Sequence, residues 1–162
     1  MGEYARKVVM LGDPAVGKTS LVRRFVSNMF DDRYLGTIGA KPSKKVVQIG
    51  EDRITLVIWD IAGVSSRSVH PSYYAGAKGA LIVSDLTRRA TMESIEWWRS
   101  NLSKSEGSVP FIVLANKSDL PDWEFDIGEI ESPYIDPMRT SAKTGEHVEK
   151  TFHDLAEMII YD

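Results

Sequence analysis

The residues from Gly12 to Thr19 read Gly-Asp-Pro-Ala-Val-Gly-Lys-Thr, a spacing of two glycines, a lysine and a hydroxyl that suits an anion. In such a loop successive backbone N–H groups curl around a phosphate, and the N-terminus of a following helix adds its dipole. Lys18 supplies a positive charge, and the hydroxyl of Thr19 stands where a Mg²⁺ ion bridging two phosphates would lie. Gly17 has no Cβ, so the main chain can approach the phosphates closely. The pattern predicts a phosphate-binding loop.

The neighbouring sequence supplies the strand and the helix that such a loop requires. The apolar run Val8-Val9-Met10-Leu11 ends a strand predicted over residues 6–11, and a helix with one apolar face is predicted over residues 18–28. The alternative is a glycine turn that binds nothing. A glycine-bounded loop between a strand and a helix favours phosphate binding over that alternative.

A second group of polar residues follows the strand predicted over residues 53–60. Asp60 comes directly after Val57-Ile58-Trp59, where its carboxylate could hold Mg²⁺ through water. Gly63 offers an N–H with no side chain to block a terminal phosphate. Taken alone, Asp60 would be read as a helix cap or a turn residue. Beside the phosphate loop, the metal-binding interpretation is the stronger one.

A third group, Asn116-Lys117-Ser118-Asp119, follows another predicted strand and indicates which base accompanies the phosphates. Guanine presents N1–H and an amine on one edge, and a single carboxylate such as Asp119 can accept both bonds. Adenine lacks that amine and has an acceptor at N1, so the same carboxylate would reject it. Ser141-Ala142-Lys143, before the last predicted helix, can close over the base. By itself this segment reads equally well as a helix-capping loop.

The elements that must position these groups alternate along the chain. Strands are predicted at 6–11, 44–49, 53–60, 80–83 and 109–115, and helices at 18–28, 91–103 and 148–159, the second and third strands forming a hairpin turned at 50–52. Alternating strands and helices indicate an α/β fold around a mainly parallel sheet, which carries its ligands at the carboxyl ends of the strands. We find no linker, repeat or low-complexity segment and expect residues 1–162 to form a single domain.

The composition excludes several classes of function and indicates the cellular compartment. The net charge is −3, so no basic excess points to nucleic acid. The chain has no cysteine, which excludes disulfides, thiolate metal sites and catalytic thiols and fits a reducing compartment. No apolar run approaches membrane-spanning length, and no secretory pattern is present. We therefore expect a cytoplasmic protein.

Together these motifs resemble the five guanine-nucleotide boxes of the Ras-superfamily small GTPases, most like the Rab branch, in the order and approximate spacing of that family. The boxes are carried by Gly12 to Thr19, Thr37, Asp60 to Gly63, Asn116 to Asp119 and Ser141 to Lys143. The resemblance implies a P-loop NTPase fold, the small G domain, which is a three-layer sandwich around a six-stranded, mostly parallel sheet. It also implies two segments, switch I at about 29–41 and switch II at about 61–75, that sense the terminal phosphate: contacts made only with GTP order both segments, and hydrolysis releases them.

Residue roles follow from the resemblance by position. Thr37 and Gly63 would contact the γ-phosphate, and together with Lys18 they are the expected catalytic residues. Thr19, Thr37 and Asp60 would hold Mg²⁺. The expected nucleotide-binding residues are Asp13, Pro14, Ala15, Val16, Gly17, Lys18, Thr19, Ser20, Phe30, Tyr34, Thr37, Gly63, Asn116, Lys117, Asp119, Ser141, Ala142 and Lys143.

Some residues depart from the family pattern. Val64 stands where the family usually has a glutamine that orients the attacking water, and valine has no hydrogen-bonding group, so we expect slow intrinsic hydrolysis. His70 reads as an ordinary surface histidine, and Arg67, Arg88 and Arg89 as surface or structural charges. Pro42 occupies a position where Rab-like chains tend to carry an aromatic residue. Residues 119–136 are rich in acidic residues and prolines and predict a short, irregular, mostly solvated segment.

Two functions of different classes follow. The first is a slow GTPase switch in membrane trafficking or signalling, accelerated by partner proteins. The second is a hydrolysis-deficient module that stays GTP-bound and serves as a scaffold. A P-loop kinase or ATPase is disfavoured by Asn116 to Asp119. Effectors, exchange factors and GTPase-activating proteins are the expected partners of a monomer, and membrane association would require a lipidated tail beyond Asp162.

Overall fold

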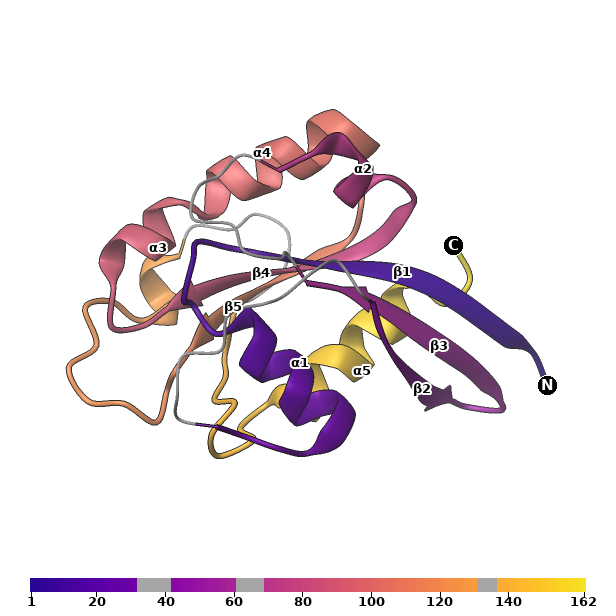
Figure 1. Cartoon of the computed structure of the whole chain (residues 1–162), viewed down its shortest axis with the longest axis horizontal. Coiled ribbons are helices and arrows are strands. Elements are labelled where there is room, and N and C mark those ends of the chain that lie inside the picture. Colours follow the sequence, from indigo (N-terminus) through magenta and orange to yellow (C-terminus); the bar gives the residue numbers. More distant parts are fainter. Residues whose placement is uncertain (32–41, 61–68, 131–136) are drawn as a thin grey trace.

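A computed structural model of the chain describes residues 1–31, 42–60, 69–130 and 137–162 (Figure 1). Its sheet has six strands in the order β2-β3-β1-β4-β5-β6. Their bounds are β1 Glu3–Leu11, β2 Ser43–Ile49, β3 Asp52–Trp59, β4 Ala77–Asp85, β5 Phe111–Asn116 and β6 Met138–Arg139. The predicted strands are all present, and each differs from its predicted bounds by a few residues. The α/β class with a six-stranded sheet is confirmed.

Strand direction follows the pattern that the sequence indicated. β1 lies between β3 and β4 and is parallel to both. β5 and β6 continue the parallel set, whereas β2 pairs antiparallel with β3 and forms one edge of the sheet. The central strand β1 is fully apolar and buried from Val8 to Leu11, as a strand covered on both faces must be.

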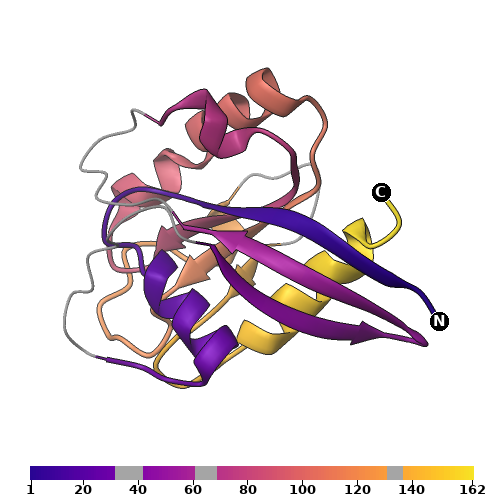
Figure 2. The same ribbon diagram turned by 45° about the vertical axis from the view of Figure 1, so that its right-hand side comes forward.

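Helices cover both faces of the sheet and complete three layers (Figure 2). α1 (Lys18–Ser27) and α5 (Val148–Ile159) pack on one face, where Phe25 and Phe152 stack with their ring centroids 4.0 Å apart. α2 (Pro71–Tyr74), α3 (Arg89–Glu93) and α4 (Ile95–Glu106) cover the other face, with Trp98 at its core. Within the described residues no helix is long and apolar enough to cross a membrane.

One helical segment differs from the sequence prediction, and one connecting segment agrees with it. The helix predicted over 91–103 is two helices, α3 and α4, which meet at Ser94. The Ser94 hydroxyl donates to the Ala90 carbonyl at 3.0 Å, a contact of the kind that bends helices. Between β5 and β6 the described residues contain only a 3₁₀ turn, Ile127–Glu129, which agrees with the irregular segment expected there.

Gly12 provides a test of how tightly the loop after β1 packs on the sheet. Its φ is +141°, and a Cβ added there would lie 2.3 Å from the Val83 carbonyl oxygen. We expect Gly12→Ala to lower the free energy of unfolding by about 2–4 kcal/mol, because both the backbone and β4 must shift. Gly50→Ala, at an open turn with φ +61°, is the control and should cost about 1 kcal/mol. Urea unfolding measures both; equal costs would contradict this packing.

Candidate functional site

The site lies where the chain leaves the carboxyl ends of β1, β3, β4 and β5, which meet at one edge of the sheet (Figure 1). The loop after β1 turns into α1, which begins at Lys18. Gly17 precedes this helix with φ +104°, a left-handed conformation that favours glycine. A Cβ on Gly17 would lie 2.3 Å from the Asn116 side-chain nitrogen, so glycine also permits the close approach of β5. No side-chain hydrogen bond from Gly17 caps the helix N-terminus, and a helix N-terminus of this kind is suited to an anion.

The outer carbonyls of the loop are bonded by side chains from several elements. Lys18 Nζ donates to the carbonyl oxygens of Gly12 and Asp13 at 2.9 and 3.0 Å. Arg88 Nη2 donates to the Pro14 carbonyl at 2.9 Å. Arg88, expected to be a surface or structural charge, makes this specific structural contact.

Side chains at the carboxyl end of β5 donate hydrogen bonds to the last part of the loop. Lys117 Nζ donates to the Ala15 carbonyl, and Asn116 Nδ2 donates to the Val16 carbonyl, both at 2.9 Å. Asn116 is buried, and its Oδ1 accepts from the Thr140 hydroxyl at 3.0 Å. The Asn-Lys pair, singled out from the sequence with the base-recognition motif, therefore also supports the loop.

The consequence of these contacts is a uniform orientation of the loop peptides. Gly17 continues the series because its carbonyl accepts from Leu21 N at 3.0 Å, so six consecutive carbonyls are bonded. No described peptide bond is cis, and a trans peptide directs its N–H opposite to its C=O. The Pro14, Ala15 and Val16 carbonyls are held by side chains from outside the loop, so the N–H groups that follow them face the opposite, inner side of the loop. Converging backbone N–H groups of this kind can bind an anion such as phosphate.

The Asp13 side chain ties the loop to α4. One carboxylate oxygen accepts from Ser94 Oγ at 2.7 Å and the other from Trp98 Nε1 at 3.0 Å. Trp98 is almost fully buried, so its indole N–H needs such a partner. Asp13 was expected to touch nucleotide. Its side chain faces the α4 layer, and contact of this residue with nucleotide stays a prediction.

Lys18 is the group whose titration the site alters most among those with a resolved value. Burial lowers the pKa of Lys18 to about 8; the nearby Arg88 acts in the same direction, while Asp60 and Asp13 oppose it. An anion bound beside the ammonium would favour its charged form. The lysine is therefore placed to gain a proton when phosphate binds.

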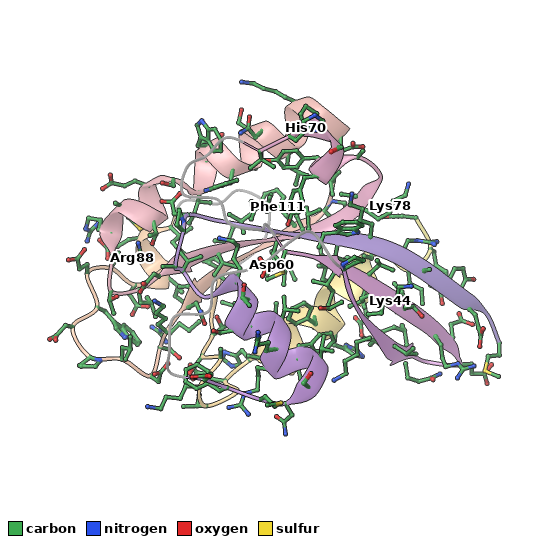
Figure 3. The ribbon with its side chains drawn as sticks, in the orientation of Figure 1. Lys44, Asp60, His70, Lys78, Arg88 and Phe111 are labelled. Atoms are coloured by element: carbon green, nitrogen blue, oxygen red, sulfur yellow. The ribbon has the colours of Figure 1, made fainter. Side chains whose placement is uncertain are left out.

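Thr19 and Asp60 meet at the mouth of the site, where Figure 3 shows Asp60 close to the start of α1. The Thr19 hydroxyl donates to an Asp60 carboxylate oxygen in a short hydrogen bond. A hydroxyl and a carboxylate are hard oxygen donors, the kind that Mg²⁺ prefers, and Mg²⁺ sites commonly use one or two protein ligands plus phosphates and water. In the described part of the chain no group of three or more acidic or histidine side chains forms a self-sufficient metal cage. The residues fit a magnesium site that phosphate completes.

The base-recognition residues also come together. Asp119 is exposed, and one of its carboxylate oxygens accepts from the buried Ser141 hydroxyl at 2.7 Å. Arg24 of α1 holds the following turn: its guanidinium donates to the Ala142 carbonyl at 2.7 Å and to the Lys143 carbonyl. The Ser-Ala-Lys segment is thus anchored beside the exposed carboxylate.

Other predicted site residues are only partly placed. Tyr34, Thr37, Gly63 and Val64 lie outside the described residues. Phe30 follows α1 and is 36% exposed, and Ser20 lies in the first turn of α1. Sequence reasoning missed several supporting residues, because each acts through a contact between distant elements: Arg24, Asp85, Arg88, Ser94, Trp98 and Thr140.

Tyr73, His70 and the acidic segment after β5 lie around the site. The Tyr73 hydroxyl lies between the ends of β1 and β3, 2.9 Å from the Met10 carbonyl and 2.5 Å from that of Trp59. His70 is exposed and caps α2, as an ordinary surface histidine would. Of the acidic segment, Asp126 pairs with Arg139 at 2.6 Å, so its charges are partly neutralised rather than only solvated.

These features describe an α/β protein with a glycine-bounded loop before α1, a hydroxyl–carboxylate pair and an exposed carboxylate beside the Ser-Ala-Lys turn. A profile of the Ras family matches residues 7–161. The chain is 36% identical to the Ras-related protein Rab-21 of Bos taurus over 97% of this chain and 74% of that protein, and 36% identical to the Homo sapiens protein of the same name over 97% and 73%. It is 33% identical to the Ras-related protein YPTC6 of Chlamydomonas reinhardtii over 98% and 77%.

The chain therefore belongs to the Ras superfamily of small GTPases, in its Rab branch. It is a GTP-binding switch of the class that acts in membrane trafficking, and members of this class are GTPases that bind GTP and GDP. The alternative of a hydrolysis-deficient scaffold finds no support in these comparisons.

The lowered pKa of Lys18 predicts that nucleotide binding takes up a proton. Free Lys18 loses its proton near pH 8, and bound phosphate restores the charged form, so affinity for GDP should fall as pH rises above about 8. Calorimetry of GDP binding at pH 8.5 in two buffers of different ionisation enthalpy should reveal uptake of up to about one proton. Lys44→Gln, at an exposed lysine of β2, is the control. Absence of uptake in the wild-type protein would contradict the assignment.

Proposed function

We propose that Gly12 to Thr19 binds the phosphates of GTP and GDP in this chain. The observation that carries the proposal is the run of six bonded carbonyls from Gly12 to Gly17, which turns the N–H groups of the loop to one side. Ala15, Val16, Gly17, Lys18, Thr19 and Ser20 offer those N–H groups. Asp13 and Pro14 shape the loop, Asp13 through α4 and Pro14 through its carbonyl.

The base-binding part of the proposal rests on Asp119. Its carboxylate accepts from N1–H and the exocyclic amine of guanine, and the Ser141 bond fixes its orientation. Asn116 and Lys117 position the base beside the loop, and the turn at Ala142 and Lys143 closes over it. Phe30 and Tyr34 border the bound nucleotide.

Thr19, Thr37 and Asp60 are the residues proposed to hold Mg²⁺. The ion, when bound, neutralises charge on the β- and γ-phosphates. Thr19 donates its hydroxyl oxygen from the start of α1, and Asp60 orients it from the end of β3. Thr37 belongs to switch I and would join only when the γ-phosphate is present.

Hydrolysis in this proposal is in-line attack of water on the γ-phosphorus, with cleavage of the bond to the β–γ bridging oxygen and release of GDP and inorganic phosphate. Lys18, Thr37 and the Gly63 N–H stabilise the charge that develops on the phosphoryl oxygens. Val64 cannot orient the water, so the intrinsic rate is low. Loss of the γ-phosphate frees switch I (about 29–41) and switch II (about 61–75).

Residues 1–162 act in this proposal as a single, monomeric domain that cycles between two partner sets. Effectors read the GTP form, and exchange factors and activating proteins set the rates. Pro42, at a position where an aromatic residue is typical of Rab-like chains, points to an effector set of its own. Peripheral attachment to a membrane would be through a lipidated tail.

The direct test is the nucleotide that the purified protein carries. Denaturation of the protein followed by chromatography should release GDP or GTP in close to equimolar amount. Release of adenine nucleotides alone, or binding of ATP in preference to GTP by the emptied protein, would overturn the proposal.

Changing Asp119 should alter which base is accepted. We expect Asp119→Asn to weaken GDP binding roughly 100-fold and to admit xanthosine diphosphate, because the amide donates where the carboxylate accepted. Fluorescent-nucleotide competition measures both affinities. Asp122→Asn, at an exposed aspartate three residues on, is the matched control. Unchanged GDP affinity in Asp119→Asn would refute the base contact.

Changing Val64 should alter the chemical step. We expect Val64→Gln to raise the single-turnover rate of GTP hydrolysis by about tenfold or more, because glutamine can orient the attacking water. Val64→Leu, which adds no hydrogen-bonding group, should leave the rate unchanged. A Val64→Gln rate equal to that of wild type would show that valine does not limit hydrolysis.

A further inference from the structure

Arg88 precedes α3 in a backbone conformation fixed on both sides. Its N–H donates to the Asp85 carbonyl at 2.9 Å, and its own carbonyl accepts from the Thr91 hydroxyl at 2.7 Å. Thr91 is buried and also accepts from the Asp85 N–H at 2.8 Å. The start of the Arg88 side chain is therefore held at the end of β4, beside the loop (Figure 3).

The guanidinium of Arg88 donates hydrogen bonds to two partners. Nε donates to a carboxylate oxygen of Asp85 at 3.0 Å, and Nη2 donates to the Pro14 carbonyl at 2.9 Å. The Asp85 side chain is only 2% exposed, whereas that of Arg88 is 43% exposed. A buried carboxylate thus orients an arginine whose outer nitrogen reaches the loop.

Asp85 orients a second cation in the same way. Lys117 Nζ lies 3.0 Å from the same carboxylate oxygen and donates to the carbonyl of Ala15, which directly follows Pro14. Burial raises the pKa of Asp85, but hydrogen bonds from Thr87, Lys117 and Arg88 outweigh it and keep the pKa below its usual value. One ionised carboxylate therefore aims two cations at adjacent peptide units of the loop.

The peptide that Arg88 holds is a critical one for the donor array. Pro14 has no N–H, so the first N–H available after it is that of Ala15. Ala15 has φ +63°, a left-handed conformation that costs a non-glycine residue about 1 kcal/mol or more. A bond to the Pro14 carbonyl fixes the orientation of the Ala15 N–H, because both belong to one trans peptide.

We propose that Arg88, oriented by Asp85, is a positioning residue of the phosphate loop that slows nucleotide dissociation by holding the Pro14–Ala15 peptide with its N–H inward. This inference rests on the proposed nucleotide binding and adds a residue that none of the five boxes contains. Arg88 acts through the loop backbone and not by contact with the nucleotide.

Arg89 offers a matched control at the adjacent position. It carries the same charge and is 44% exposed, but its guanidinium contacts Glu129 and the Glu124 carbonyl instead of the loop. Arg88→Ala and Arg89→Ala change the net charge equally. Equal net charge removes the long-range contribution, and Arg88→Lys, which keeps the charge at position 88, separates the loop contact from the effect of Arg88 on Lys18.

The experiment is stopped-flow displacement of fluorescent GDP from wild type, Arg88→Ala and Arg89→Ala. We expect Arg88→Ala to speed dissociation about five- to tenfold, the loss of one hydrogen bond from a charged donor, and Arg89→Ala to change it less than twofold. Amide hydrogen exchange in the GDP-bound protein should increase at Ala15 in Arg88→Ala only, which a general loss of stability would not produce.

Arg88→Lys covers the case in which the alanine variant folds poorly. Lysine keeps the charge but cannot bond Asp85 and Pro14 through separate nitrogens in a fixed fork, so dissociation should be intermediate. Equal rates for all arginine variants and wild type, with GDP still bound, would overturn the role of Arg88 while leaving the proposed function intact. Absence of guanine-nucleotide binding in wild type would overturn both.

Discussion

The structure depends on the opposite directions of C=O and N–H in each trans peptide of the phosphate loop. For the N–H groups to face a ligand, every carbonyl of the loop must face the protein and find a donor there. The donors come from α1, from β5 and from the start of α3, which lie together because β4 and β5 follow β1 in the sheet. The strand order thus places the loop at the strand ends and also places hydrogen-bond donors next to its carbonyls.

The hydrogen bonds to the loop carbonyls also bring three positively charged side chains to the loop, and nearby carboxylates partly neutralise them. Lys18, Arg88 and Lys117 all reach the loop from different elements. Asp85 is buried between two of them, and Asp13 lies on the side of α4. Burial, and to a smaller extent Arg88, lower the pKa of Lys18 to about 8 against the opposing effect of Asp60 and Asp13, and a bound anion would favour its charged form.

Much of this architecture could be predicted from the sequence. Apolar runs gave the strands, and the glycine and lysine spacing gave the loop, because such patterns act locally. The division of the helix expected over 91–103 could not be predicted, since it depends on Ser94 bonding both Ala90 and Asp13. Arg88 was read as a surface or structural charge, because the pairing that fixes it on the loop joins residues 74 positions apart. Contacts of that kind carry no periodic signal.

The Asp13–Trp98 hydrogen bond gives the protein an intrinsic optical probe of its loop. Indole emission shifts with the polar groups around the ring, and here one of those groups belongs to the loop itself. Trp98 is 1% exposed, whereas Trp123 is 38% exposed and Trp59 and Trp97 are only partly buried. A water-soluble quencher therefore quenches the fluorescence of the other three indoles first, and the remaining emission comes from Trp98, which contacts the loop through Asp13.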